Sequence, residues 1–126
     1  MSWDTAREIL DAKFQTLPEL GSAYVQFSNT APKTPPTAMH YKIDLIPTGV
    51  SPELAGSDHE RGIYQVTVLD TAGNGSDAAL VAAQAVINHF KRQNLSGVSI
   101  GVPTLARPIQ LPNWWSVPVS IPFIVL

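Results

Sequence analysis

The sequence predicts an α+β domain: a mixed, mainly antiparallel sheet of five to six strands with two helices packed on it, in the order α-β-β-β-α-β-β-β. Three observations lead to this prediction. An amphipathic helix opens the chain, a strand leads through a glycine turn into a second helix between residues 61 and 93, and residues 114–126 alternate as one long strand. A chain of 126 residues buries roughly two-thirds of its unfolded surface in one core, so a single domain spanning 1–126 is expected.

The central strand and helix carry the clearest periodicity. Residues 63–69 are mostly β-branched, aromatic or aliphatic, and their alternation puts Tyr64, Val66 and Val68 on one face. The opposite face is only partly polar, which places this strand inside the sheet. Turn-forming residues end it. Apolar side chains at helical spacing then fill 78–92, with alanines that allow close approach to the sheet.

The first helix follows from Ala6, Leu10 and Phe14, which recur at helical spacing with charged residues on the opposite side. Pro18 disfavours helical backbone in the residue before it, so the helix is expected to end by Leu17.

The remaining segments are shorter. Two stretches rich in turn-forming residues, 28–38 and 47–61, are expected to be long exposed loops. In the strand expected before the second loop, Tyr41 faces the core and His40 faces outward. The shorter strands are expected at 23–27, 40–46, 98–102 and 105–111.

The closing strand contains two prolines, Pro118 and Pro122, four residues apart. Proline has no N–H to donate to a sheet, and same-parity residues direct their backbone groups to the same lateral side. One side of this strand can therefore pair regularly and the other cannot. The strand is accordingly predicted to lie at the edge of the sheet.

Charge is low overall and unevenly distributed. The formal net charge is -2, so sequence-specific nucleic acid is not an expected partner. No apolar run is long enough for a membrane span, and the absence of cysteine fits a reducing compartment. From residue 93 to 126 the only Lys, Arg, Asp or Glu is Arg107. Such a stretch is expected to be partly buried and partly covered by another subunit.

Catalytic, cofactor and metal sites are not expected. The three histidines, His40, His59 and His89, fall on different elements without metal-ligand spacing. The triplet Asp58-His59-Glu60 supports a small enzyme as one alternative. The glycine turn at 73–76 lacks the lysine of a phosphate-binding loop.

A tryptophan pair begins the closing strand. Trp114 and Trp115 are expected to be an interface anchor on one face and part of the core on the other, since aromatic residues are enriched at the centres of interfaces. A monomeric or dimeric ligand-binding module, in which both tryptophans frame an apolar pocket, is a second alternative.

Several stretches together resemble a known family. They are the first helix, the strand RGIYQVTVL with its glycine turn and the helix AALVAAQAVINHF, and the closing WWSVPVSIPFIV. The chain is similar, over about residues 4–125, to the tail terminator proteins of long-tailed bacteriophages and prophages, the lambda-type minor tail protein and its relatives. The resemblance implies a structural protein with no catalytic residues and no cofactor.

The same resemblance implies partners and a location. Such proteins form a hexameric ring on the head-proximal end of the tail tube, stop its polymerisation and present a surface to the head–tail connector. The chain is then expected in the host bacterial cytoplasm during assembly and in the virion tail afterwards. Another head–tail joining or minor tail protein of the same fold is the nearest alternative.

In a closed ring, subunits meet through two different surfaces. We expect the outward face of the closing strand to meet charged residues that precede the central strand, which set the register. These interface residues are Trp114, Ser116, Ser120, Ile124, Asp58, Glu60 and Arg61. The two long loops are expected to contact other tail components. The loop residues are Lys33, Thr34, Thr48, Val50 and Glu53.

Overall fold

The computed structural model describes residues 3–18, 25–27, 39–52, 58–73, 77–91, 93–95 and 97–125; at 3, 49–52 and 58–60 it describes the backbone alone. These residues form two helices and one mixed eight-stranded sheet, which confirms the predicted α+β class. In chain order the elements are α1 (Trp3–Gln15), β1 (Val25–Gln26), β2 (His40–Pro52), β3 (Asp58–Thr71), α2 (Asp77–Phe90), β4 (Asn94–Leu95), β5 (Val98–Ile100), β6 (Thr104–Leu105), β7 (Ile109–Gln110) and β8 (Trp114–Val125).

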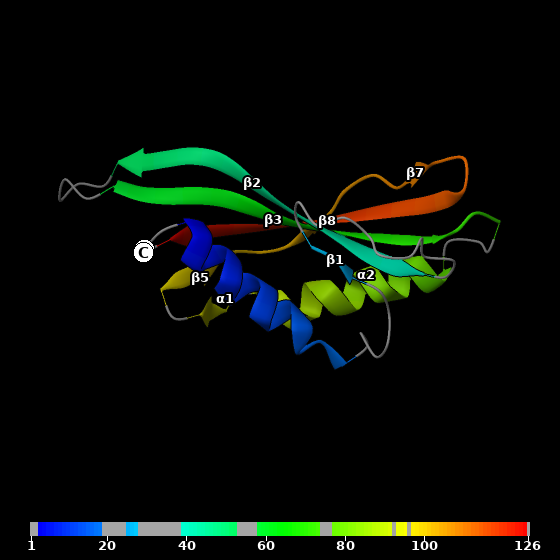
Figure 1. The fold of residues 1–126 in the computed structure, drawn as a ribbon, viewed down its shortest axis with the longest axis horizontal. Helices are drawn as coiled ribbons and strands as arrows, with labels where there is room; N and C mark the ends of the chain where they lie inside the picture. The colour runs from blue at the N-terminus through cyan, green and yellow to red at the C-terminus, as the bar shows by residue number, and fades with distance from the viewer. Residues whose placement is uncertain are drawn as a thin grey trace.

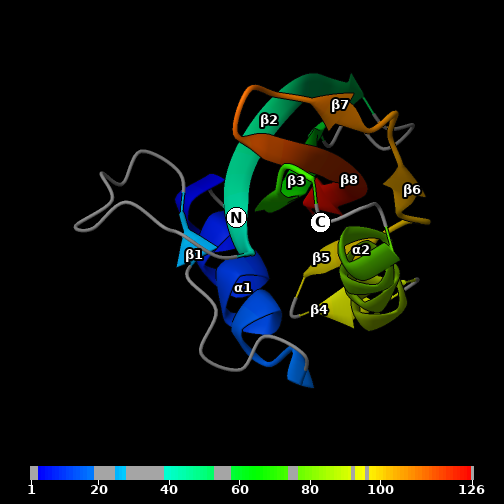
Figure 2. The ribbon, with the colours of Figure 1, turned by 90° about the vertical axis from the view of Figure 1, so that its right-hand side faces the viewer.

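The molecule has two layers, because α1 and α2 lie on the same side of a curled sheet (Figures 1 and 2). The strand order is β1-β2-β3-β8-β5-β4, and β6 and β7 also pair with β8. The β1–β2 pair is parallel and the other described pairs are antiparallel. One face of the sheet therefore forms the core with the helices, and we call the opposite face the outer face.

Strand β3 lies at the centre of the sheet, between β2 and β8, as its two-sided apolar pattern predicted. Tyr64, Val66 and Val68 are fully buried on the core face. On α1, Ala6, Leu10 and Phe14 are fully buried. Burial of each large apolar side chain contributes about 1.5–3 kcal/mol relative to exposure.

The second helix brings small residues and aromatic rings against the sheet. Ala79, Ala82 and Ala83 are buried, so the α2 backbone approaches the strands closely. The Phe90 ring lies 5.8 Å from the Tyr64 ring, between ring centroids. At the far end of α2, His89 Nε2 lies 2.8 Å from the carbonyl oxygen of Lys13 on α1, which joins the two helices.

The position of β8 differs from the sequence prediction. It is an interior strand, with β3 on one side and β5, β6 and β7 on the other. The half of the prediction that concerned proline is correct. The carbonyl groups of Pro118 and Pro122 accept hydrogen bonds from Ala106 and Gly101, so the positions without an N–H face the side of the short strands. Three short strands fill that side because no long ladder can form past the prolines.

The predicted loop at 47–61 was wrong for 47–52 and 58–61, which belong to strands, and residues 53–57 lie outside the described residues. Strand β2 continues to Pro52 and β3 begins at Asp58, so the two strands extend together as a long hairpin arm (Figure 1). The register shifts between Pro47 and Gly49, where a bulge accommodates residues that favour turns. The predicted loop at 28–38 lies outside the described residues.

His40 lies on the outer face, as predicted. Its side chain is nevertheless buried there, at 5% exposure. The Trp114 ring meets it nearly edge-on, with centroids 4.7 Å apart and an interplanar angle of 83°. His40 is on β2 and Trp114 on β8, so the indole reaches across β3. The alternation of β2 correctly placed His40 on the outer face. Its burial there depends on Trp114, which is distant in the sequence.

Candidate functional site

The described histidines do not form a catalytic or metal-binding group. His40 packs against Trp114 on the outer face, and His89 contacts α1 on the core side. His59 belongs to β3, where the backbone alone is described. Among the described residues, no group of three His, Asp or Glu side chains is placed to hold a metal ion.

Trp114 and Trp115 do not frame one pocket. Adjacent residues of a strand face opposite sides of a sheet, and Trp115 packs against the core while Trp114 lies on the outer face. The arrangement expected of a ligand-binding module with both tryptophans in its wall is therefore not present.

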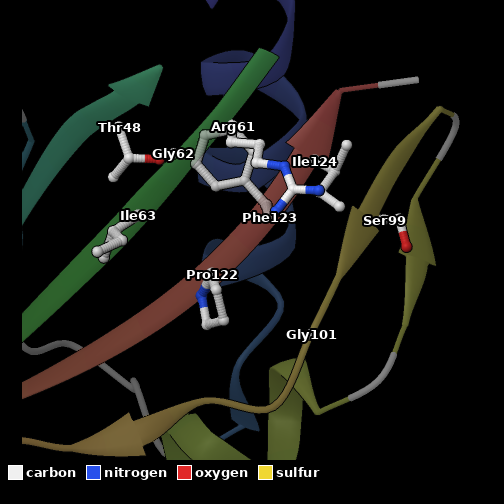
Figure 3. A pocket seen from close by; sticks show the side chains of 9 residues that line it. All are labelled: Thr48, Arg61, Gly62, Ile63, Ser99, Gly101, Pro122, Phe123 and Ile124. Carbon is white, nitrogen blue, oxygen red and sulfur yellow. The ribbon is translucent and has the colours of Figure 1, made fainter. Parts of the chain in front are cut away.

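A hollow of about 360 Å³ opens on the outer face where β3, β8 and β5 run side by side. We call it the outer-face groove. Figure 3 shows its lining. Polar groups come from Thr48, Arg61 and Ser99, and apolar groups come mainly from Ile63, Pro122 and Ile124; Gly62, Gly101 and Phe123 complete the lining.

Gly101, the residue that follows β5, lies beside Pro122 of β8 in the lining of the groove. Strand β5 pairs with β8 over three residues, and the Gly101 N–H then donates to the Pro122 carbonyl at 2.9 Å. A Cβ at position 101 would lie 3.2 Å from Cγ of Pro122. Glycine therefore leaves the space open and the proline ring forms one wall.

Among the side chains that the structure describes, Arg61 is the one charged residue in the lining of the groove. Its side chain is exposed and lies over β8 beside Ile124 (Figure 3). The ion pairs found among the described side chains join Arg7 to Asp4 and to Asp11, so Arg61 has no counterion within the described part of the chain. The groove thus combines an apolar wall with a cation that no described side chain neutralises.

The predicted interface residues fall at two ends of the outer face. Arg61 and Ile124 are direct register partners, and Ser120 is opposite Gln65. Trp114 is opposite Thr71 at the other end of the same pair of strands. Ten residues separate positions 114 and 124, or about 33 Å of extended strand, so the predicted set cannot form one compact patch.

The other predicted residues have mixed outcomes. Ser116 is buried, at 7% exposure, and Thr48 is exposed on β2 at the rim of the groove. Val50, Asp58 and Glu60 belong to strands whose side chains are not described there. Lys33, Thr34 and Glu53 lie outside the described residues.

Several groove residues were not singled out from the sequence. Ile63 and Pro122 share the parity of Arg61 and Ile124, and strict alternation would have identified them. Ser99 and Gly101 needed the pairing of β5 with β8, which no local pattern specifies.

The charge-poor C-terminal third has apolar side chains on its surface. Val102, Leu105, Ile109 and Leu111 are 39–52% exposed. Prolines at 103, 108 and 112 interrupt this segment. An exposed apolar segment of this kind is typical of a protein that contacts other proteins.

No helix among the described residues is long and apolar enough to cross a bilayer. Exposed apolar side chains on the surface of a small domain are typical of a protein that contacts other proteins.

Comparison with known proteins gives the family. A family model described as phage tail terminator protein matches residues 5–123, nearly the whole chain, and the chain belongs to this family of structural phage tail proteins. One solved structure is similar over 100% of this chain and 96% of that structure's chain, with a TM-score of 0.71 and 24% sequence identity. Its name does not state a function. That likeness concerns the fold alone. No curated protein matches.

Proposed function

We propose that this protein caps the head-proximal end of a phage tail tube as a ring of identical subunits. The ring ends polymerisation of the tube protein and offers its other side to the head–tail connector. Assembly takes place in the host bacterial cytoplasm, and the protein then remains in the virion tail. Membership of the tail terminator family supports this role.

The single observation that carries the proposal is the surface of the charge-poor third of the chain. Four large apolar side chains are exposed in the segment 102–111, where Arg107 is the only charged residue. Water contact with these side chains is unfavourable by roughly 25 cal/mol per Å² of apolar surface, so contact with other subunits is stabilising. A ring covers such a surface without leaving an open end.

The outer face is the proposed place of subunit contact. Arg61 and Ile124 stand together at one end, and the exposed part of Trp114 stands at the other. Two separate patches on one face allow each subunit to contact more than one neighbouring protein in a ring.

The test is electron microscopy of the purified protein, alone and mixed with tail tubes of the same phage, together with its mass in solution. We expect rings, a mass of several times 13.6 kDa (six times for a hexamer) and one ring at a single end of each tube. Tube protein polymerising in its presence should give tubes that no longer grow at the capped end.

Other outcomes separate the alternatives. Binding to heads or connectors without binding to tube ends would indicate another head–tail joining protein of the same fold. A monomer that binds neither tubes nor connectors would contradict the proposed function.

A further inference from the structure

The first two turns of α2 present an exposed ridge. Asp77 and Ala78 are exposed, and Val81 is 69% exposed, the highest value among the large apolar side chains that the structure describes as exposed. Residues four apart on a helix lie on the same side, so the Asp77 carboxylate stands beside the Val81 methyl groups. We call Asp77, Ala78 and Val81 the α2 ridge. It carries one negative charge and one exposed apolar side chain, and with Met39, Tyr41 and Ala82 it borders a shallow hollow of about 410 Å³.

The outer-face groove has the complementary character. It is concave and apolar, with the guanidinium of Arg61 beside Ile124 and Pro122. No described side chain forms an ion pair with Arg61 or with Asp77. Opposite charges across a contact fix the register of two subunits and exclude wrong partners.

The ridge and the groove of one chain cannot meet each other. Arg61 lies ten residues before Thr71, where β3 ends ahead of α2, which is about 33 Å along the strand. Figure 1 shows β5 and the end of β8 toward one end of the long axis and α2 toward the other. Only a second copy can bring a ridge to a groove.

We propose that the α2 ridge of one subunit binds in the outer-face groove of the next, with Asp77 paired to Arg61 and Val81 packed against Ile124. The proposal rests on the ring assembly proposed above and names the two faces of its repeating contact. Because the two faces differ, the contact is head-to-tail. It closes into a ring when the rotation between neighbours divides a full turn.

Mixing two variants tests this arrangement. Arg61→Glu impairs the groove and leaves the ridge intact, and Val81→Glu impairs the ridge and leaves the groove intact. We expect each variant alone to lose at least about tenfold in association, measured by light scattering and sedimentation. Mixed together they should form a 1:1 complex of twice 13.6 kDa, because one good contact remains.

Matched controls address folding and charge. Val81 is exposed, so its substitution should leave the circular dichroism spectrum and the thermal midpoint unchanged. Lys91→Glu makes the same charge change as Arg61→Glu at an exposed position beyond the end of α2, and should assemble like the wild type. The charge swap Arg61→Glu with Asp77→Lys should recover association relative to either single change.

Disulfide trapping tests the same contact even when it is short-lived. The chain has no cysteine, so Val81→Cys with Ile124→Cys introduces one thiol on each face. Under oxidation the double variant should form covalent multimers larger than dimers, whereas each single variant can form dimers at most. Double-variant multimers no larger than those of the single variants would overturn the proposal.

Failure of this inference can be told from failure of the ring itself. A wild type that forms rings, with Arg61→Glu and Val81→Glu variants that form them equally well, overturns the ridge-and-groove contact and leaves the proposed function standing. A wild type that forms no multimer and no trapped species, alone or with tail tubes, overturns both.

Discussion

The phenol of Tyr64 on β3 donates a hydrogen bond to the carboxylate of Asp11 on α1, 53 residues away in the sequence. Tyr64 is fully buried, and Arg7 donates to the second oxygen of Asp11 at 3.1 Å. One carboxylate thus joins the first helix to the centre of the sheet and is itself held by a neighbouring cation one turn away.

Removing the phenol oxygen tests the strength of this link. We expect Tyr64→Phe to lower the free energy of unfolding by about 1.5–3 kcal/mol, because the half-buried carboxylate of Asp11 loses a hydrogen bond in a poorly solvated site. Urea unfolding followed by circular dichroism measures the change. Asp4→Asn, which removes an exposed ion pair of Arg7, is the matched control and should lower the free energy of unfolding much less than Tyr64→Phe does. Equal losses of unfolding free energy in Tyr64→Phe and Asp4→Asn would show that burial of the Asp11 carboxylate does not strengthen its hydrogen bond to Tyr64.

The same carboxylate gives a pH dependence. Burial raises the pKa of Asp11 above its ordinary value of 3.8, against the opposing effects of Tyr64 and Arg7. The folded protein therefore keeps this proton to higher pH than the unfolded chain. The stability that protonation contributes is present below pH 3.8 and is lost as pH rises through the raised pKa.

Asp11→Asn isolates this effect, since asparagine does not titrate. The free energy of unfolding of the wild type minus that of Asp11→Asn should fall as pH rises from about 3 and then level off. Urea unfolding at closely spaced pH values gives this difference. A difference that stays constant, or rises with pH, would show that the pKa of Asp11 is not raised in the folded protein.

The edge-on contact of Trp114 with His40 should appear as a coupling energy. In a double-mutant cycle of Trp114→Leu and His40→Leu we expect a coupling of about 0.5–1.5 kcal/mol, typical of aromatic pairs. A cycle with Lys42→Ala, an exposed residue two positions further along β2, is the control and should give no coupling. No difference between the two cycles would show that the contact contributes nothing to stability.

Hydrogen exchange should differ on the two sides of β8. The Pro118 and Pro122 carbonyls face the short strands, so amides of the opposite parity, such as those of Val117 and Val119, face the long ladder with β3. We expect these amides to exchange only on global unfolding. Amides of β6 and β7, which pair with β8 over two residues each, should exchange at least ten times faster through local opening. Uniform protection across β8, β6 and β7 would contradict this.

The elements whose pattern is complete within a short window were predicted correctly. Tyr64, Val66 and Val68 alternate in one strand, and Leu10 and Phe14 follow one helical face, so their burial follows from spacing alone. The hairpin arm was missed because turn-forming residues at 47–61 dominate the local sequence pattern. In the structure, a bulge in β2 and pairing with a long partner strand override that local preference. For the site, Arg61 and Ile124 were named from the sequence, whereas Ser99 and Gly101 required knowledge of which strand lies beside β8.

The sequence by itself determined the two helices, the central strand, the charge-poor C-terminal third and the side of β8 that proline leaves without donors. The tertiary structure decided that β8 lies inside the sheet, that Trp114 covers His40, and that a groove opens beside Arg61. The physical reason is the range of the interactions. Periodicity and missing N–H groups are properties of neighbouring residues, whereas the choice of partner strand depends on contacts between residues far apart in the chain.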